Sequence, residues 1–135
     1  MSDVTFPSEV RELLDQPNPA VITTMRPDGQ PVSVATWYAM DGDRVLVNMD
    51  EGRKRLDYLR GDPRVSLTVL ADGDWYTHVS MQGRVVEMSE DVGLAGIDRL
   101  SKHYRGRPYT NRDRGRVNAW IDVDRWHGWG QVEQD

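Results

Sequence analysis

A two-residue alternation of apolar with small or polar side chains runs through much of the chain and predicts β-strands. It is clearest in PVSVATWYAM, residues 31–40, and in RVNAWIDV, residues 116–123. The turn-forming sequences PDG and DGD separate successive segments of this kind. Gly83 lies inside the longest expected strand and marks a candidate β-bulge. The pattern predicts six strands, at residues 20–25, 31–40, 44–49, 64–71, 75–88 and 116–123.

Three further segments carry apolar residues at helical spacing, and we expect them to be helices. Gly61 lies at the end of the second, where a glycine favours termination. Ser89 is the expected N-cap of the third, because two acidic residues follow it in the first turn. The three helices are expected at residues 8–15, 51–63 and 89–104.

The resulting order of elements is α-β-β-β-α-β-β-α-β. Consecutive hairpins without regular β-α-β alternation argue against a doubly wound sheet. A mainly β, α+β fold accommodates the pattern best, namely a six-stranded antiparallel barrel, closed or nearly closed, with short flanking helices. The chain has 135 residues and no repeat or linker, so we expect one domain over residues 1–135.

Composition narrows the classes of function. Hydrophobic residues are 38% and charged residues 29%, which is ordinary for a globular protein. No apolar run approaches the roughly 20 residues of a membrane span, and the N-terminus lacks a secretory signal pattern. The absence of cysteine excludes disulfides and thiolate metal sites. The net charge of −5 argues against a nucleic-acid partner, and we expect a cytoplasmic protein with no membrane partner.

Sequence motifs for common catalytic sites are missing. The chain has no glycine-rich dinucleotide or P-loop motif and no G-x-S-x-G elbow. No metal site is expected, because no two of the three histidines, His78, His103 and His127, have the spacing of metal ligands.

A basic cluster opens the second expected helix. Arg53, Lys54 and Arg55 stand where the helix dipole already disfavours positive charge. A phosphate bound to the free N–H groups and clamped by these side chains relieves that repulsion. The alternative is a solvated helix end whose charges are balanced by three acids, Asp50, Glu51 and Asp57. The chemistry of the residues leaves both interpretations open.

A second basic cluster, RGRPYTNRDRGR, covers residues 105–116. It is either a grip for a charged ligand tail or a solvated loop, and the residue chemistry favours the loop. RNA binding is a remote third interpretation. The aromatic content is also unusual, because five tryptophans accompany a single phenylalanine. They pack the core or a subunit interface, or line a cleft for a planar ligand.

Four segments, in order, resemble a known family: SVATWYAMDGDRVLVNM, GRKRLDYLRGDPRVSLTV, WYTHVSMQGRVVEM and RVNAWIDVDRWHGWG. They are similar to the landmarks of the split β-barrel flavin and deazaflavin oxidoreductases, the pyridoxamine 5′-phosphate oxidase-like proteins. The resemblance covers roughly residues 8–130. The short length and the DPRV sequence most resemble the branch that uses the deazaflavin coenzyme F420, whereas the longer oxidases use FMN.

The resemblance implies a homodimer with two equal cofactor sites at the subunit interface. The cofactor phosphate is expected on Arg53 and Lys54, with Arg55 beside them and the Gly52 N–H within reach. His78 matches a position where the FMN oxidases place a ring-contacting glutamine. The ring is expected against Val34, Ala35, Thr36, Asn48 and Met49. Asn48 and Gly52 depart from the family, which often has Thr and Ser there.

The function implied by the resemblance is F420-dependent hydride transfer between the deazaflavin and an electron-poor small-molecule substrate. No protein base is demanded, because the cofactor carries the chemistry. Tyr38, His78 and Tyr109 are candidate proton donors. Vitamin B6 oxidation is not supported, since the residues that bind pyridoxal phosphate have no counterpart. The alternatives are an FMN-binding reductase or oxidase of the same fold and a non-catalytic F420 carrier.

Overall fold

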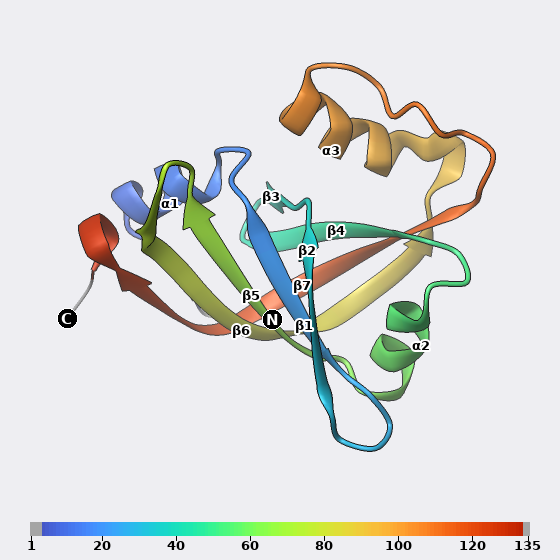
Figure 1. Ribbon diagram of the computed structural model, residues 1–135, viewed down its shortest axis with the longest axis horizontal. Coiled ribbons are helices and arrows are strands. Elements are labelled where there is room, and N and C mark those ends of the chain that lie inside the picture. The colour runs from blue at the N-terminus through green and yellow to red at the C-terminus, as the bar shows by residue number, and fades with distance from the viewer. Residues whose placement is uncertain (1–3, 134–135) are drawn as a thin grey trace.

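The computed structural model describes residues 4–133. They form one antiparallel sheet of seven strands in the order β2-β1-β5-β6-β7-β4-β3, curled into a split barrel (Figure 1). The strands are β1 (Ala20–Met25), β2 (Pro31–Thr36), β3 (Ala39–Asp41), β4 (Arg44–Asp50), β5 (Arg64–Ala71), β6 (Asp74–Glu90) and β7 (Arg116–Trp129). The helices are α1 (Ser8–Leu14), α2 (Lys54–Gly61) and α3 (Ala95–Arg105), with single 3-10 turns η1 (Val92–Leu94) and η2 (Gly130–Val132).

The predicted mainly β barrel is confirmed, with seven strands in place of six. The difference arises in residues 31–40, which divide into β2 and β3 around Trp37 and Tyr38. Because β2 and β3 are the two edges of the sheet, these two residues carry the chain across the split in the barrel. The Tyr38 side chain is fully buried, and its hydroxyl donates to the Leu14 carbonyl at 2.8 Å. This buried anchor fixes the crossing.

The start of the third helix differs from the prediction. β6 continues to Glu90, so Ser89 lies in a strand and does not cap the helix. The cap is Asp91, whose carboxylate accepts the N–H groups of Gly96 at 2.7 Å and Ile97 at 2.9 Å. The turn η1 stands between the cap and α3, and Leu94 has a left-handed φ of 60°. The predicted bounds of α2 were also too wide, because Lys54 is its first residue.

A bulge lies at Gly83 as predicted, but its extra residue, Asp124, belongs to the neighbouring strand β7 and not to β6. The register between β6 and β7 shifts between Gln82 and Gly83. A Cβ atom added at Gly83 would lie only 1.9 Å from the carbonyl oxygen of Asp122 on β7, so no side chain fits there. The absence of a side chain lets the two longest strands approach and curl around the core.

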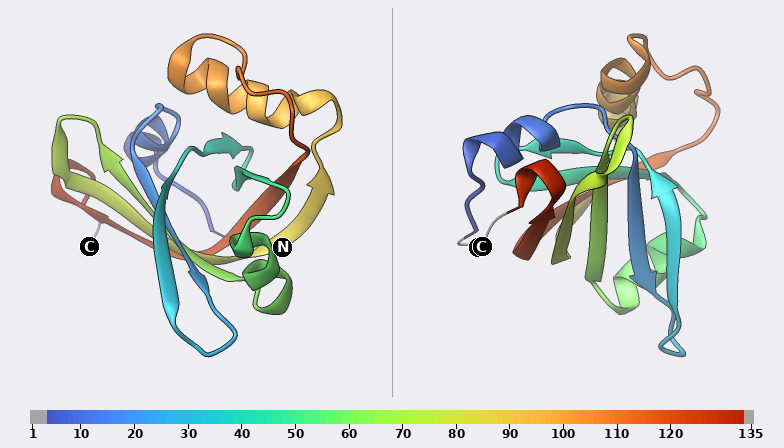
Figure 2. Two further views of the ribbon diagram at one scale, coloured as in Figure 1. Left: turned by 45° about the vertical axis from the view of Figure 1, so that its right-hand side comes forward. Right: turned by 60° about the vertical axis from the view of Figure 1, so that its left-hand side comes forward.

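The helices cover different parts of the barrel. Figure 2 shows α3 across one end of the barrel opening and α2 toward the other end. Val10 and Leu14 of α1 are fully buried in the barrel core. Among residues 4–133, no helix is long and apolar enough to span a membrane.

Candidate functional site

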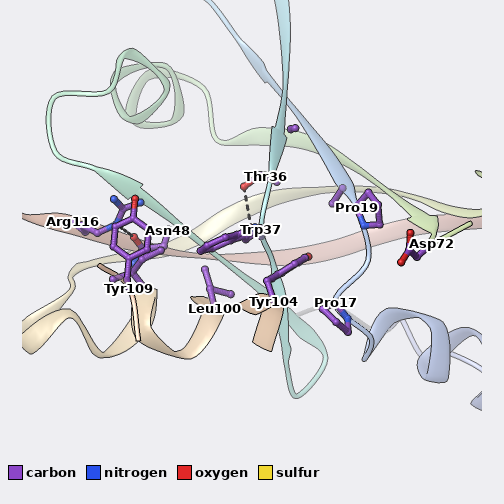
Figure 3. Close-up of a pocket in the computed structure, with 13 residues that line it drawn as sticks. Pro17, Pro19, Thr36, Trp37, Asn48, Asp72, Leu100, Tyr104, Tyr109 and Arg116 are labelled. Carbon is purple, nitrogen blue, oxygen red and sulfur yellow. Dashed lines mark hydrogen bonds between the residues drawn. The ribbon is translucent and has the colours of Figure 1, made fainter. Parts of the chain in front are cut away.

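Two pockets lie along β2, on the side where the barrel is split. The α2 pocket, of about 550 Å³, is lined by β2 and the start of α2. The α3 pocket, of about 530 Å³, is lined by the end of β2, by β4 and by α3 (Figure 3). Ala35 lines both, so the two pockets meet at this position of β2.

The α2 pocket contains the basic cluster. Gly52, Arg53, Lys54 and Arg55 line one side of it, and apolar residues of β2 line the other. Gly52 adopts a φ of 86°, which turns the chain from β4 into α2. Arg53 is the residue before the helix and Lys54 is its first residue. The predicted basic helix start is therefore part of a concave site.

The acids next to this cluster neutralise only part of it. Asp50 pairs with Arg53 at 3.7 Å, and it also accepts a hydrogen bond from Arg116 on β7. Asp57 pairs with Arg60 at the far end of α2. Within residues 4–133, neither Lys54 nor Arg55 forms an ion pair with an acidic side chain. Within the described residues only Arg53 of the three has an acidic partner, and it shares Asp50 with Arg116, so the charges at this helix end are not fully balanced.

Arg55 has an unmet hydrogen-bonding requirement. Its Nε atom is buried and has no hydrogen-bond partner within the described residues. Burial and the nearby charges of Arg53 and Arg116 lower the pKa of the Arg55 guanidinium. An anion bound beside the guanidinium in this pocket would offset the repulsion. The residues of the α2 pocket therefore fit the phosphate of a cofactor.

Aromatic rings form the walls of the α3 pocket. Trp37 stacks on Tyr104 with centroids 5.4 Å apart and an interplanar angle of 11°. Tyr109 meets Trp37 edge-on at 6.1 Å. Leu100 of α3 lies beside these rings (Figure 3). The pocket has the shape and lining expected for a planar ligand.

A buried polar network closes one end of the α3 pocket. The Arg116 Nε donates to the Asn48 side-chain oxygen at 2.6 Å, and the guanidinium lies 5.0 Å over the Tyr109 ring. The Asn48 amide nitrogen donates to Asp91 at 2.9 Å and to Asn118 at 2.7 Å. Because Asp91 caps α3, the network fixes that helix relative to β4 and β7.

The structure brings most of the expected cofactor residues to the two pockets. Those that line the α2 pocket are Val34, Ala35, Gly52, Arg53, Lys54 and Arg55. Thr36 and Asn48 line the α3 pocket, although the Asn48 amide is already bonded within the protein. Met49 is 1% exposed in the barrel core and lines neither pocket.

His78 lies away from both pockets of its own chain. Its ring stacks on Trp129 at 5.9 Å, and its Nδ1 is 2.8 Å from the Tyr76 carbonyl. Of the other proton-donor candidates, Tyr109 lines the α3 pocket, whereas Tyr38 does not. Burial raises the pKa of the Tyr38 phenol far above its usual range, and its hydroxyl is bonded to a main-chain carbonyl. Tyr38 thus lines neither pocket, and its hydroxyl is bonded to the main chain.

The Arg-rich segment has several different roles. Arg112 forms a two-bond pair with Asp98 at 2.9 and 3.1 Å, and Arg105 lies 5.5 Å over the Trp37 ring. Arg116 belongs to the buried network. Arg107 and Arg114 are exposed and form no ion pair within the described part of the chain. The segment thus contains three arginines that contact other side chains and two that have no acidic partner within the described residues.

Sequence reasoning missed the roles of Arg116, Tyr104 and Leu100. The charge at Arg116 was visible, but it was assigned to the loop. Its role follows from strand register, because Arg116 on β7 pairs directly with Asp50 on β4. Had the pairing of β4 with β7 been known, the opposite charges of Asp50 and Arg116 at paired positions would have indicated this contact.

Comparison with known proteins places these features in context. A family model described as pyridoxamine 5′-phosphate oxidase matches residues 6–130. A solved structure named F420 reductase is 25% identical, covers 89% of this chain and 97% of its own, and superposes with a TM-score of 0.81. A conserved hypothetical protein from Mycobacterium tuberculosis is also 25% identical, with coverages of 93% and 85% and a TM-score of 0.74. None of the curated proteins compared with the chain matches it.

More distant structures share the fold. General Stress Protein 26 from Bacillus anthracis is 17% identical, with coverages of 90% and 91% and a TM-score of 0.66. At this identity the likeness concerns the barrel alone.

Proposed function

Because this chain belongs to the pyridoxamine 5′-phosphate oxidase-like family of flavin and deazaflavin oxidoreductases, we propose that it is a cytoplasmic F420-dependent oxidoreductase. It transfers a hydride between the deazaflavin and an electron-poor small-molecule substrate. The observation that carries this proposal is the α2 pocket, which is lined by Lys54 and Arg55, two cations that have no acidic partner within residues 4–133. The likeness to a protein named F420 reductase supports the deazaflavin as cofactor.

Different residues of the α2 pocket contact different parts of the proposed cofactor. Arg53, Lys54 and Arg55 supply positive charge to the cofactor phosphate, and the Gly52 N–H supplies a donor. Val34 and the neighbouring β2 residues form an apolar wall that excludes water from the ring. The bound cofactor itself supplies the hydride chemistry.

One residue is positioned to handle a proton. Tyr109 lines the α3 pocket, and its ring packs against the Arg116 guanidinium. Its backbone N–H is fixed by the Asp98 carboxylate at 3.0 Å. We assign its hydroxyl as the donor to the reduced product, and Tyr109→Phe should lower turnover while cofactor binding stays unchanged.

We further propose a homodimer with a cofactor site at each end of the interface. His78 lies outside the pockets of its own chain, next to exposed aromatic rings. Trp75 is 72% exposed, Tyr76 57% and Trp129 40%. Exposed aromatic side chains grouped in this way are typical of a protein–protein interface. Association of two copies buries this surface and is the way His78 reaches a cofactor ring. Sedimentation at micromolar concentration should give the mass of two chains, and a single-chain mass would contradict the shared site.

Cofactor titration tests the proposed function directly. The purified protein is titrated calorimetrically with F420 and with FMN, and turnover is followed by deazaflavin absorbance. Tighter binding of F420 with reduction of an acceptor supports the proposal. Tighter binding of FMN, with a flavin spectrum in the purified protein, favours the FMN reductase or oxidase. Tight F420 binding without turnover of any acceptor favours the remaining alternative, a non-catalytic F420 carrier.

A further inference from the structure

The α3 pocket extends beyond the residues that the cofactor is expected to contact. It runs along α3 from Arg116 at one end, past Trp37 and Leu100, to Pro17 and Asp72 at the other (Figure 3). Its volume of about 530 Å³ suits a small organic ligand. The residues proposed to bind the cofactor phosphate, Gly52 and residues 53–55 (the phosphate clamp), line the α2 pocket. The α3 pocket is therefore left for a second molecule.

The aromatic walls of this pocket are held in fixed orientations. Tyr104 donates its hydroxyl to the Asn18 carbonyl at 2.7 Å and accepts the Tyr38 N–H at 3.4 Å. Burial raises the pKa of the Tyr104 phenol to about 12, so the ring stays neutral. Trp37 stacks on Tyr104 with nearly parallel planes. Rings fixed in this way form a flat wall, which favours a planar ligand over a flexible one.

The chemistry of one end of the pocket favours a negatively charged group. Arg116 is only 8% exposed, yet it lines the pocket, and bonds to Asn48 and Asp50 fix its guanidinium. Asp50 also pairs with Arg53, so one carboxylate balances two guanidiniums. The Asp91 carboxylate, which accepts from Asn48, adds a second negative charge to this network. Arg116 is nevertheless the charged side chain that lines this end of the pocket, whereas Asp72 lines the opposite end (Figure 3).

We infer that the α3 pocket is the substrate site and that it binds a planar conjugated carboxylate. The ring lies along Trp37 and Tyr104, with Tyr109 at its edge, and the carboxylate lies at Arg116. The assignment of this ligand as the substrate rests on the proposed function, because it sets the ligand beside the cofactor at Ala35. The preference for a planar anion rests on the pocket alone.

Calorimetry with the full-length protein and two matched probes tests the inference. trans-Cinnamate and trans-cinnamamide have the same ring and length but differ in charge. We expect cinnamate to bind about tenfold tighter, the value of one charge-assisted hydrogen bond partly offset by desolvation. Arg116→Gln should remove this preference, and Tyr109→Ala should weaken both probes. Arg26→Gln, at an ion-paired arginine that lines neither pocket, should change neither.

A second arm separates this inference from the proposed cofactor. Lys54→Ala should weaken F420 but leave cinnamate binding unchanged, and cinnamate should bind with F420 already in place. Equal affinities for the acid and the amide would overturn the inference, as would loss of cinnamate binding in Lys54→Ala. It would also fail if Tyr109→Ala weakened F420 and cinnamate alike, because the pocket would then belong to the cofactor.

Two further outcomes keep the test decisive. If neither F420 nor FMN binds while the acid is still preferred over the amide, the site stands and the proposed function falls. If Arg116→Gln does not fold, the ratio of acid to amide affinity in the parent protein and in Tyr109→Ala decides the matter.

Discussion

Replacing Lys54 by alanine is the sharpest test of the phosphate clamp. Lys54 opens α2, lines the α2 pocket and forms no ion pair within residues 4–133. A charge-assisted hydrogen bond contributes about 1.5–3 kcal/mol. Because Lys54 is exposed to solvent, screening places its contribution near the lower end of that range. Lys54→Ala should therefore weaken cofactor binding by about tenfold.

The same substitution should leave the fold intact. A positive charge in the first turn opposes the helix dipole by about 0.3–1 kcal/mol, and alanine is the better helix former. Without cofactor, the variant should be as stable as the parent or more stable by up to about 1 kcal/mol. A loss of binding together with unchanged or raised stability is a signature that general unfolding cannot produce.

The assay combines calorimetric titration of F420 and FMN with thermal unfolding of the free protein. Arg60→Ala is the matched control, since it removes a cation from the last turn of the same helix, outside the pocket. Arg60→Ala should bind both cofactors like the parent. If Lys54→Ala also bound both within about twofold of the parent while folded, the phosphate would not lie here. The assignment of Gly52, Arg53 and Arg55 would then be withdrawn with it.

Three other predictions follow from the same contacts. Replacing Arg107 and Arg114 together by alanine should weaken F420 more than FMN in titrations, because the F420 tail carries carboxylates that FMN lacks and these two cations have no acidic partner within residues 4–133. Equal losses would indicate a solvated loop. The hydrogen bond from Arg112 lowers the pKa of the Asp98 carboxylate, so this pair stabilises the fold above about pH 4 and loses its effect as the pH falls through the lowered value. Asp98→Asn should accordingly lower the melting temperature at pH 7, and this loss should shrink as the pH is lowered below about 4. A pH-independent difference would contradict the pairing. Gly83→Ala should cost at least about 2 kcal/mol in denaturant unfolding, because the new Cβ meets the backbone of β7, whereas Gly61→Ala, with open space around it, serves as the neutral control.

Local patterns in the sequence were enough to predict most helices and strands and the basic cluster at the start of α2. Alternation and turn residues placed the strands of residues 20–25 and 64–71 with the bounds that the structure has. The basic cluster at 53–55 was found because its members are contiguous, and a helix start makes them converge on one point. The resemblance to the family, carried by ordered segments along the chain, is confirmed by the family model that matches residues 6–130.

The errors came where tertiary contacts override a local pattern. Trp37 and Tyr38 continue the alternation of β2, yet burial of Tyr38 in the core ends the strand and carries the chain across the split. Ser89 is a good N-cap residue, but pairing with β7 keeps it in β6, and Asp91 caps the helix instead. In each case, contacts with distant residues outweigh a local preference of about 1 kcal/mol.

The sequence by itself determined which residues form strands, where the chain turns and which helix start carries the basic cluster, because each is encoded within a few consecutive residues. Only the tertiary structure decided that Arg116 meets Asp50 and Asn48, that Trp37 stacks on Tyr104, and that a second pocket opens under α3. A period of two fixes the face on which a side chain lies but not the strand that lies beside it. Strand order is set by how the whole barrel closes around its core, so the site that depends on that order follows from the fold and not from any one segment.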